Sequence, residues 1–139
     1  MKNYGSLLRR FLGGMAAQTQ GAATVEFAMV LPAMLIGILG IMETGRLVWV
    51  QNSLQFAAEE AGRFAMVNAT ASSAVLTTRV INKLAGVNPD SVTVVVTPDA
   101  VGGVNFVRID ATTTFQFLSG LLPVGSITLT GRSRVPQIT

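Results

Sequence analysis

The 139 residues of the chain suffice for one small domain with an appended segment. Half of them are hydrophobic and 12% are charged, a composition that excludes a disordered tail and disfavours a purely soluble protein. Because the chain has no cysteine and no histidine, it cannot form disulfides, thiolate metal sites or a Ser-His-Asp triad. The net charge of +3 is concentrated near the N-terminus, which disfavours a nucleic-acid-binding surface on the folded domain. We therefore expect no enzyme, no cofactor, no metal, no nucleic-acid partner and no small-molecule substrate.

The first 21 residues form a basic head. Lys2, Arg9 and Arg10 precede Gly21 and no acidic residue does, whereas the remaining basic residues balance the seven acidic ones. Positive charges in front of an apolar segment are typical of the cytoplasmic end of a membrane helix. The charge pattern therefore indicates membrane topology.

An apolar segment follows over residues 27–42, where no side chain is charged. Together with the apolar residues on either side, it reaches the length of about 20 residues that a spanning helix needs. We predict a transmembrane helix over residues 22–46. Pro32 lies inside it and is expected to kink the helix or loosen one turn.

Beyond the membrane segment, apolar residues recur at three- and four-residue spacing, which predicts that the helix continues over residues 47–68. This apolar stripe consists of Leu47, Val50, Leu54, Ala57, Ala61 and Phe64. A second, shorter helix is predicted over residues 73–85, with Gly86 placed to end it.

From residue 91 onward the hydrophobic period changes from 3.6 to 2, which predicts three half-buried antiparallel strands near residues 91–97, 104–117 and 126–135. Gly102-Gly103 joins the first two strands. Three short strands cannot bury their apolar face alone, so the stripe on the long helix must supply the other half of the core. The expected fold class is α+β: a long N-terminal transmembrane helical spine packed on a small antiparallel sheet, with one extra short helix. The strand order stays open.

The small residues Gly21 and Ala22 lie before the apolar segment, whereas the cleavage site of an ordinary secretory signal lies after it. Cleavage between them would remove the basic head and retain the apolar helix. Glu26 would then be the fifth residue of the mature chain. A carboxylate at the edge of the hydrocarbon costs about 2–3 kcal/mol if it is unpaired. The new amine of Ala22, in the same chain or in a neighbouring subunit, would neutralise it.

The stretch GAATVEFAMVLPAML resembles the processing site and helix start of the TadE-like family of minor pilins, or pseudopilins, of tight-adherence (Flp, type IVc) pilus systems. The downstream stretch SLQFAAEEAGRFA is similar to that family too, so that the resemblance covers about residues 18–66. It implies that a prepilin peptidase cleaves after Gly21 and that Glu26, followed by Phe27, serves processing and assembly.

The resemblance also implies a location and partners. Residues 1–21 would be a cytoplasmic leader peptide, and residues 47–139 would form an α+β domain in the periplasm, anchored in the bacterial inner membrane. The implied partners are the prepilin peptidase, other minor and major pilins, the inner-membrane assembly platform and the lipid bilayer. Whether the protein enters the filament or stays at its base remains open.

An alternative interpretation needs no cleavage. The chain would be an uncleaved single-pass anchor that presents a small β-rich binding module, with Gly21 as a flexible turn and Glu26 as the end of the anchor. This alternative predicts that Glu26→Ala leaves function unchanged, whereas the pilin interpretation predicts loss of assembly.

Overall fold

The computed structural model describes residues 19–117 and 125–137. The chain divides into two compact units, residues 1–40 and residues 41–139, and each is described separately. Helix α2 (Thr19–Val67) contributes to both units. The basic head, apart from its last three residues, and most of the connection between the second and third strands lie outside the described residues.

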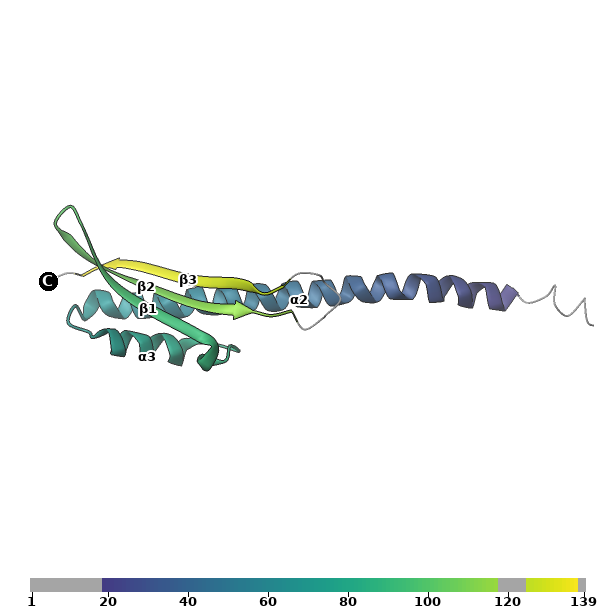
Figure 1. Cartoon of the computed structure of the whole chain (residues 1–139), viewed down its shortest axis with the longest axis horizontal. Coiled ribbons are helices and arrows are strands. Elements are labelled where there is room, and N and C mark those ends of the chain that lie inside the picture. The colour runs from purple at the N-terminus through teal and green to yellow at the C-terminus, as the bar shows by residue number, and fades with distance from the viewer. Residues whose placement is uncertain (1–18, 118–124, 138–139) are drawn as a thin grey trace, which may run out of the picture. The chain divides into compact units, whose positions relative to one another are not determined.

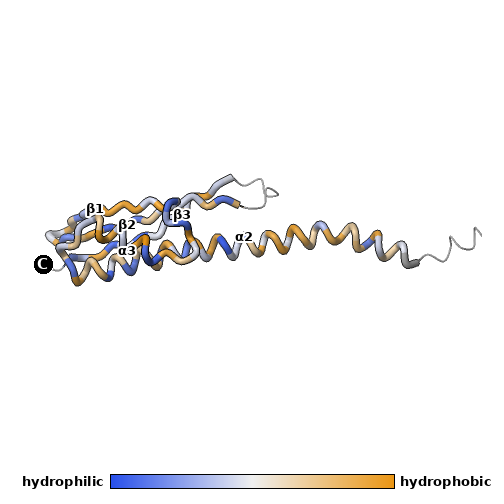
Figure 2. Tube along the Cα trace, turned by 90° about the horizontal axis from the view of Figure 1, so that it is seen from below, coloured by the Kyte–Doolittle hydropathy of each residue, from blue (hydrophilic) through white to orange (hydrophobic). Residues whose placement is uncertain are grey.

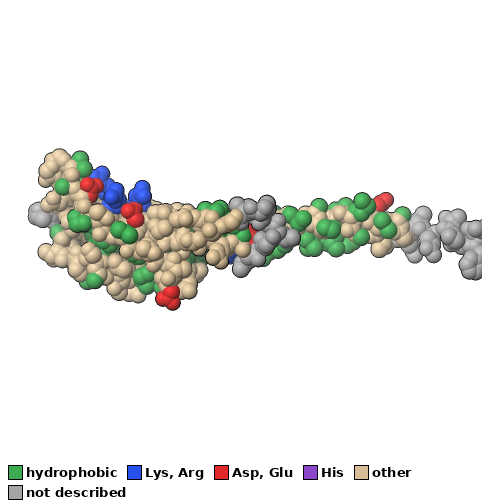
Figure 3. All heavy atoms as spheres, in the orientation of Figure 1, with side chains coloured by type: hydrophobic (Ala, Val, Ile, Leu, Met, Phe, Trp, Pro, Cys, Tyr) green, Lys and Arg blue, Asp and Glu red, His purple; other side chains and the backbone are tan. Residues whose placement is uncertain are grey.

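In the first unit, α2 exposes its apolar side chains. Residues 21–40 are exposed except Leu31 and Gly40, which are half-buried. Hydrophobic residues predominate along this part of α2 in Figures 2 and 3. Among the described residues, α2 is the one helix long and apolar enough to cross a membrane, with a mean hydropathy of 2.2 over its most apolar window, none of which is buried within the protein. The first unit therefore has the character of a membrane anchor.

The second unit combines two helices with a three-stranded sheet (Figure 1). The helices are residues 41–67 of α2 and α3 (Ser73–Lys83), followed by the 3₁₀ turn η1 (Pro89–Ser91). The strands β1 (Val92–Val101), β2 (Val104–Phe115) and β3 (Ile127–Pro136) pair antiparallel in the order β1-β2-β3. The predicted α+β class is confirmed, and the sheet is a simple meander.

One core joins all of these elements. Val50, Leu54, Ala57 and Ala61 of the predicted stripe are buried, and Leu47 and Phe64 pack against them partly exposed. The rest of the buried cluster comes from Ala65 of α2, Leu76 and Val80 of α3, Val107, Ile109, Ala111 and Phe115 of β2, and Leu129 of β3. Every second residue of β2 from Val107 to Phe115 is buried, as the period of 2 predicted.

The helix ends follow from local hydrogen bonds. The side chain of Asn68 donates to Phe64 O at 3.1 Å at the end of α2, and Ser72 caps α3 by accepting from the N–H of Val75. Helix α3 stops at Lys83, two residues before the predicted end. The N–H of Ala85 leaves the helical pattern because it donates to Ser53 Oγ of α2 at 2.8 Å.

The hairpin between β1 and β2 turns at Gly102 and Gly103, with φ of 61° and 78°. Positive φ at both central residues is the type I′ geometry, whose twist matches that of the flanking strands. β1 extends to Val101, beyond the strand predicted near 91–97. Pro98 lies within it, which an edge strand tolerates where no N–H is required.

Candidate functional site

The residues singled out for processing lie on the first turns of α2. Gly21 and Ala22 are the third and fourth residues of the helix, and both are exposed. A Cβ at Gly21 would meet no atom within 4 Å. The bond between Gly21 and Ala22 therefore lies on an accessible surface of α2.

Glu26 lies one helical turn after Ala22, on the same side of α2. Its side chain is exposed, and among the described residues no ion pair involves it. Val25 and Phe27 on either side are 61% and 59% exposed. Glu26 is thus an exposed carboxylate set in an apolar surface, one helical turn from Ala22.

Pro32 lies inside α2, which is assigned as one continuous helix from Thr19 to Val67. Helix α2 therefore continues through Pro32 without a break. A kink at this position stays a prediction.

At the start of the second unit, Glu43 and Arg46 fasten α2 to the end of β2. Arg46 Nη2 lies 3.0 Å from Glu43 Oε2 and also donates to Gln116 O, while its guanidinium carbon lies 4.2 Å from the centroid of the Phe115 ring. Glu43 is 5% exposed. In the sequence, these two charged residues follow the uncharged segment of residues 27–42. Their i,i+3 spacing was the available signal for an ion pair.

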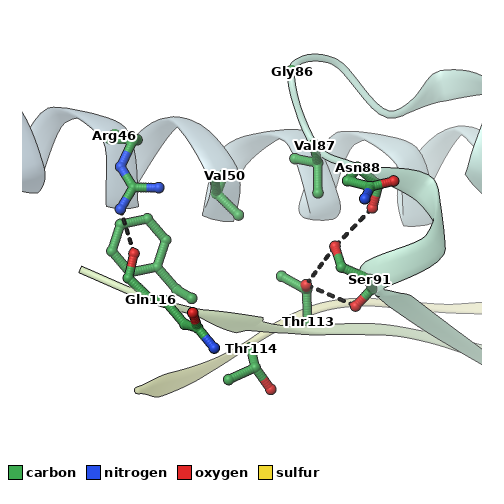
Figure 4. Close-up of a pocket in the computed structure, with 10 residues that line it drawn as sticks. Arg46, Val50, Gly86, Val87, Asn88, Ser91, Thr113, Thr114 and Gln116 are labelled. Carbon is green, nitrogen blue, oxygen red and sulfur yellow. Dashed lines mark hydrogen bonds between the residues drawn. The ribbon is translucent and has the colours of Figure 1, made fainter. Parts of the chain in front are cut away.

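A cavity of about 460 Å³ lies beside Arg46 (Figure 4). Its polar side chains bond to nearby backbone groups: Thr113 Oγ1 donates to Ser91 O at 2.9 Å, Ser91 Oγ donates to Asn88 O at 2.7 Å, and Asn88 Oδ1 accepts from Asp90 N at 3.1 Å. These bonds tie η1 to β2. The polar groups of the cavity therefore serve the fold, and they form no acid–base pair directed into the open space.

The outer face of the sheet carries paired charges. Arg132 Nε lies 2.6 Å from Asp110 Oδ1, and Arg134 Nη2 lies 2.8 Å from Asp99 Oδ2. Arg134 also stacks over the Phe106 ring, with its guanidinium carbon 4.4 Å from the centroid. Within residues 19–117 and 125–137, no group of three or more Asp or Glu residues is placed to hold a metal ion.

Comparison with protein families gives a match to the model described as TadE-like protein, over residues 21–63. No curated protein and no solved structure matches the chain. The matched segment begins at Gly21 and includes Glu26, Phe27 and Pro32, while α3 and the sheet lie outside it. The resemblance indicated by the sequence is thus confirmed over residues 21–63, which match the TadE-like model.

Proposed function

We propose that this chain is a minor pilin, or pseudopilin, that serves the assembly of a tight-adherence (Flp, type IVc) pilus. The observation that carries the proposal is the exposed apolar part of α2 after Gly21, residues 22–42, which contains the single acid Glu26 and falls within the TadE-like match. An apolar surface of this length is stable only in a bilayer or against other apolar helices. A subunit that moves from the membrane into an assembly meets both environments.

In this proposal a prepilin peptidase cleaves after Gly21. The exposure of Gly21 and Ala22 supports this step, because a peptidase can reach the bond between them. The basic head is removed and the apolar helix is retained. The protein is then the substrate of an enzyme and has no enzymatic role of its own.

Glu26 then gains a partner. Cleavage creates a positively charged α-amine on Ala22, at the helix end that already carries partial positive charge. The carboxylate of Glu26 in one subunit pairs with the amine of the subunit before it, which offsets about 2–3 kcal/mol of exposure to hydrocarbon. Phe27 follows Glu26 on the apolar part of α2 and belongs to the same proposed processing and assembly site.

The proposed location is the bacterial inner membrane, with the basic head in the cytoplasm, residues 22–46 in the bilayer and residues 47–139 in the periplasm. The positive charges of Lys2, Arg9 and Arg10 favour this orientation. The proposed partners are the prepilin peptidase, other minor and major pilins, the inner-membrane assembly platform and lipid.

The experiment compares pilus assembly in cells that carry Glu26→Ala with cells that carry Glu59→Ala. Both substitutions remove one exposed glutamate from α2, but Glu59 lies on the second unit, where it accepts from Gln55 at 2.6 Å. We expect Glu26→Ala to abolish assembled pili at unchanged protein level, and Glu59→Ala to leave them. Normal pili in the Glu26→Ala cells would contradict the proposal and favour the uncleaved anchor.

A further inference from the structure

The charged residues that follow the apolar segment lie on the core side of α2. Glu43 is buried, and it precedes the core residue Val50 by about two helical turns. Arg46 pairs with Glu43 at 3.0 Å and also donates to Gln116 O at the end of β2 (Figure 4). These two charges therefore meet each other within the second unit, and they do not border the other side of the helix.

The side of α2 that faces away from the sheet stays uncharged further along the chain. Its exposed residues in the second unit recur with the helical period and are Ile41, Gly45, Val48, Trp49, Asn52 and Phe56. The first charged residue on this side is Glu59. The exposed apolar surface thus continues past the level of Arg46 to Trp49, and the polar Asn52 follows one turn later.

Trp49 is 60% exposed, yet its ring is held in one position. Its Nε1 donates to Ala85 O at 3.0 Å, at the end of the α3 segment. The backbone at Gly86, where φ is 70°, lies so close to the indole that a Cβ there would stand 2.9 Å from Nε1. Because the N–H is already bonded, the exposed part of the ring can enter an apolar boundary without burying an unpaired donor.

Helix length gives the level of Trp49 in a bilayer. At about 1.5 Å per residue, residues 27–46 cover about 30 Å, the thickness of the hydrocarbon, and each headgroup layer adds about 5–7.5 Å. Trp49 lies about 4.5 Å beyond Arg46 along the helix, and Phe56 about 15 Å beyond it. A tilt of up to about 40° shortens both values by no more than about a quarter. Trp49 therefore falls within the headgroup layer and Phe56 outside it.

We propose that the uncharged side of α2 stays in contact with lipid as far as Trp49, and that the Trp49 ring lies among the lipid headgroups. Tryptophan favours this level, because its ring is largely apolar and has one polar edge. The bond to Ala85 O then holds the connection between α3 and η1 next to the membrane surface. This inference rests on the proposed membrane anchoring, and none of it depends on cleavage after Gly21.

The test uses the fluorescence of Trp49, which is the only tryptophan of the chain. The full chain is reconstituted into phosphatidylcholine vesicles, and flotation of the vesicles shows whether it has inserted. Quenching is compared between lipids brominated in the upper part of the acyl chains, lipids brominated near the chain ends, and iodide in the water. We expect the upper bromines to quench Trp49 at least about twofold more than the deep ones, as an interfacial ring requires.

The matched control is the double variant Trp49→Phe, Phe56→Trp, which moves the single tryptophan two turns along the same side of α2. Phe56 is 52% exposed, so the new ring is accessible as well. Iodide should quench this variant strongly and brominated lipid should not. Because the chain has no cysteine, nitroxide labels on Val48→Cys and Phe56→Cys give a second measurement that keeps Trp49 in place. The label at 48 should collide mainly with oxygen dissolved in lipid, and the label at 56 with a water-soluble nickel complex.

Three results would overturn this inference. If the inserted chain shows Trp49 open to iodide and untouched by brominated lipid, the lipid contact fails while the membrane anchoring stands. If Trp49 is shielded from lipid and from iodide, and the shielding is lost when more lipid dilutes the protein, a second copy covers this side instead. If the chain does not float with the vesicles, the anchoring in the proposed function fails, and the lipid contact fails with it.

Discussion

Gly131 of β3 lies directly against the backbone of Leu54 in α2. A Cβ at residue 131 would stand 2.6 Å from Gln55 N and closer still to the Leu54 carbonyl group. About two turns further along α2, Gly62 lies against the side chains of Ser133 and Val135. The helix and the strand therefore meet backbone to backbone, and this approach brings Gln55 within reach of the β3 edge.

Gly131→Ala should destabilise the second unit by about 3 kcal/mol, the upper part of the range for overpacking, because backbone atoms cannot move aside as a side chain does. The measurement is the free energy of unfolding by denaturant in detergent micelles. Gly125→Ala is the matched control, since a Cβ there meets nothing within 4 Å. Equal stability of the two variants would show that α2 and β3 are not held this closely.

Arg46→Ala should destabilise the second unit by about 2–3 kcal/mol, because it removes the guanidinium that pairs with the carboxylate of Glu43. Glu43 is only 5% exposed. Arg46→Lys keeps the charge but loses the planar group over Phe115, so an intermediate loss is expected. Arg63→Ala removes a surface pair with Glu60, where the Arg63 side chain is 58% exposed, and should cost less than about 1 kcal/mol. Denaturant unfolding of the three variants checks this order. A smaller loss for Arg46→Ala than for Arg63→Ala would refute it.

Gln55→Ala should cost about 1–2 kcal/mol, because it leaves the N–H and C=O of Arg132 without their side-chain partner. Gln55→Glu keeps the acceptor for the N–H but places a carboxylate against the carbonyl, so its loss should be at least as large. Asn52→Ala, on the exposed side of α2, should be nearly neutral. Unfolding free energies and exchange at the Arg132 amide measure these effects. Unchanged exchange in Gln55→Ala would show that the glutamine does not protect the edge.

Gly103→Val should destabilise the second unit by about 1–3 kcal/mol, because a β-branched residue is strained at φ of 78°. Gly102→Asn should be tolerated, since asparagine adopts the left-handed region in type I′ turns. Unfolding free energies of the two variants provide the check. A neutral Gly103→Val would mean that the turn does not have this geometry in solution.

Periodicity was sufficient to predict most of the fold. The stripe from Leu47 to Phe64 predicted the helical half of the core, and the alternation along β2 predicted its buried face. The close approach at Gly131, the bonds of Gln55 and the position of Arg46 over Phe115 depend on which segments meet in space. The hydrophobic pattern of one segment does not show which other segments it contacts.

For the processing site, the sequence predicted the residue types and the structure adds their placement. Gly21, Ala22 and Glu26 fall on the exposed start of α2, within the TadE-like match. The chemistry assigned to them involves a peptidase and a neighbouring subunit. Those roles cannot be read from the fold of one chain, because the charge that Glu26 needs appears only after cleavage.

The central claim is that the basic head is removed and the apolar helix with Glu26 is retained. The most direct test is mass spectrometry of the protein's N-terminal peptide, isolated from the membrane fraction of cells with and without an active prepilin peptidase. The account predicts a chain that begins at Ala22 when the peptidase is active, and one that retains the head when it is absent. A chain that still begins at Met1 in cells with the active peptidase would contradict it.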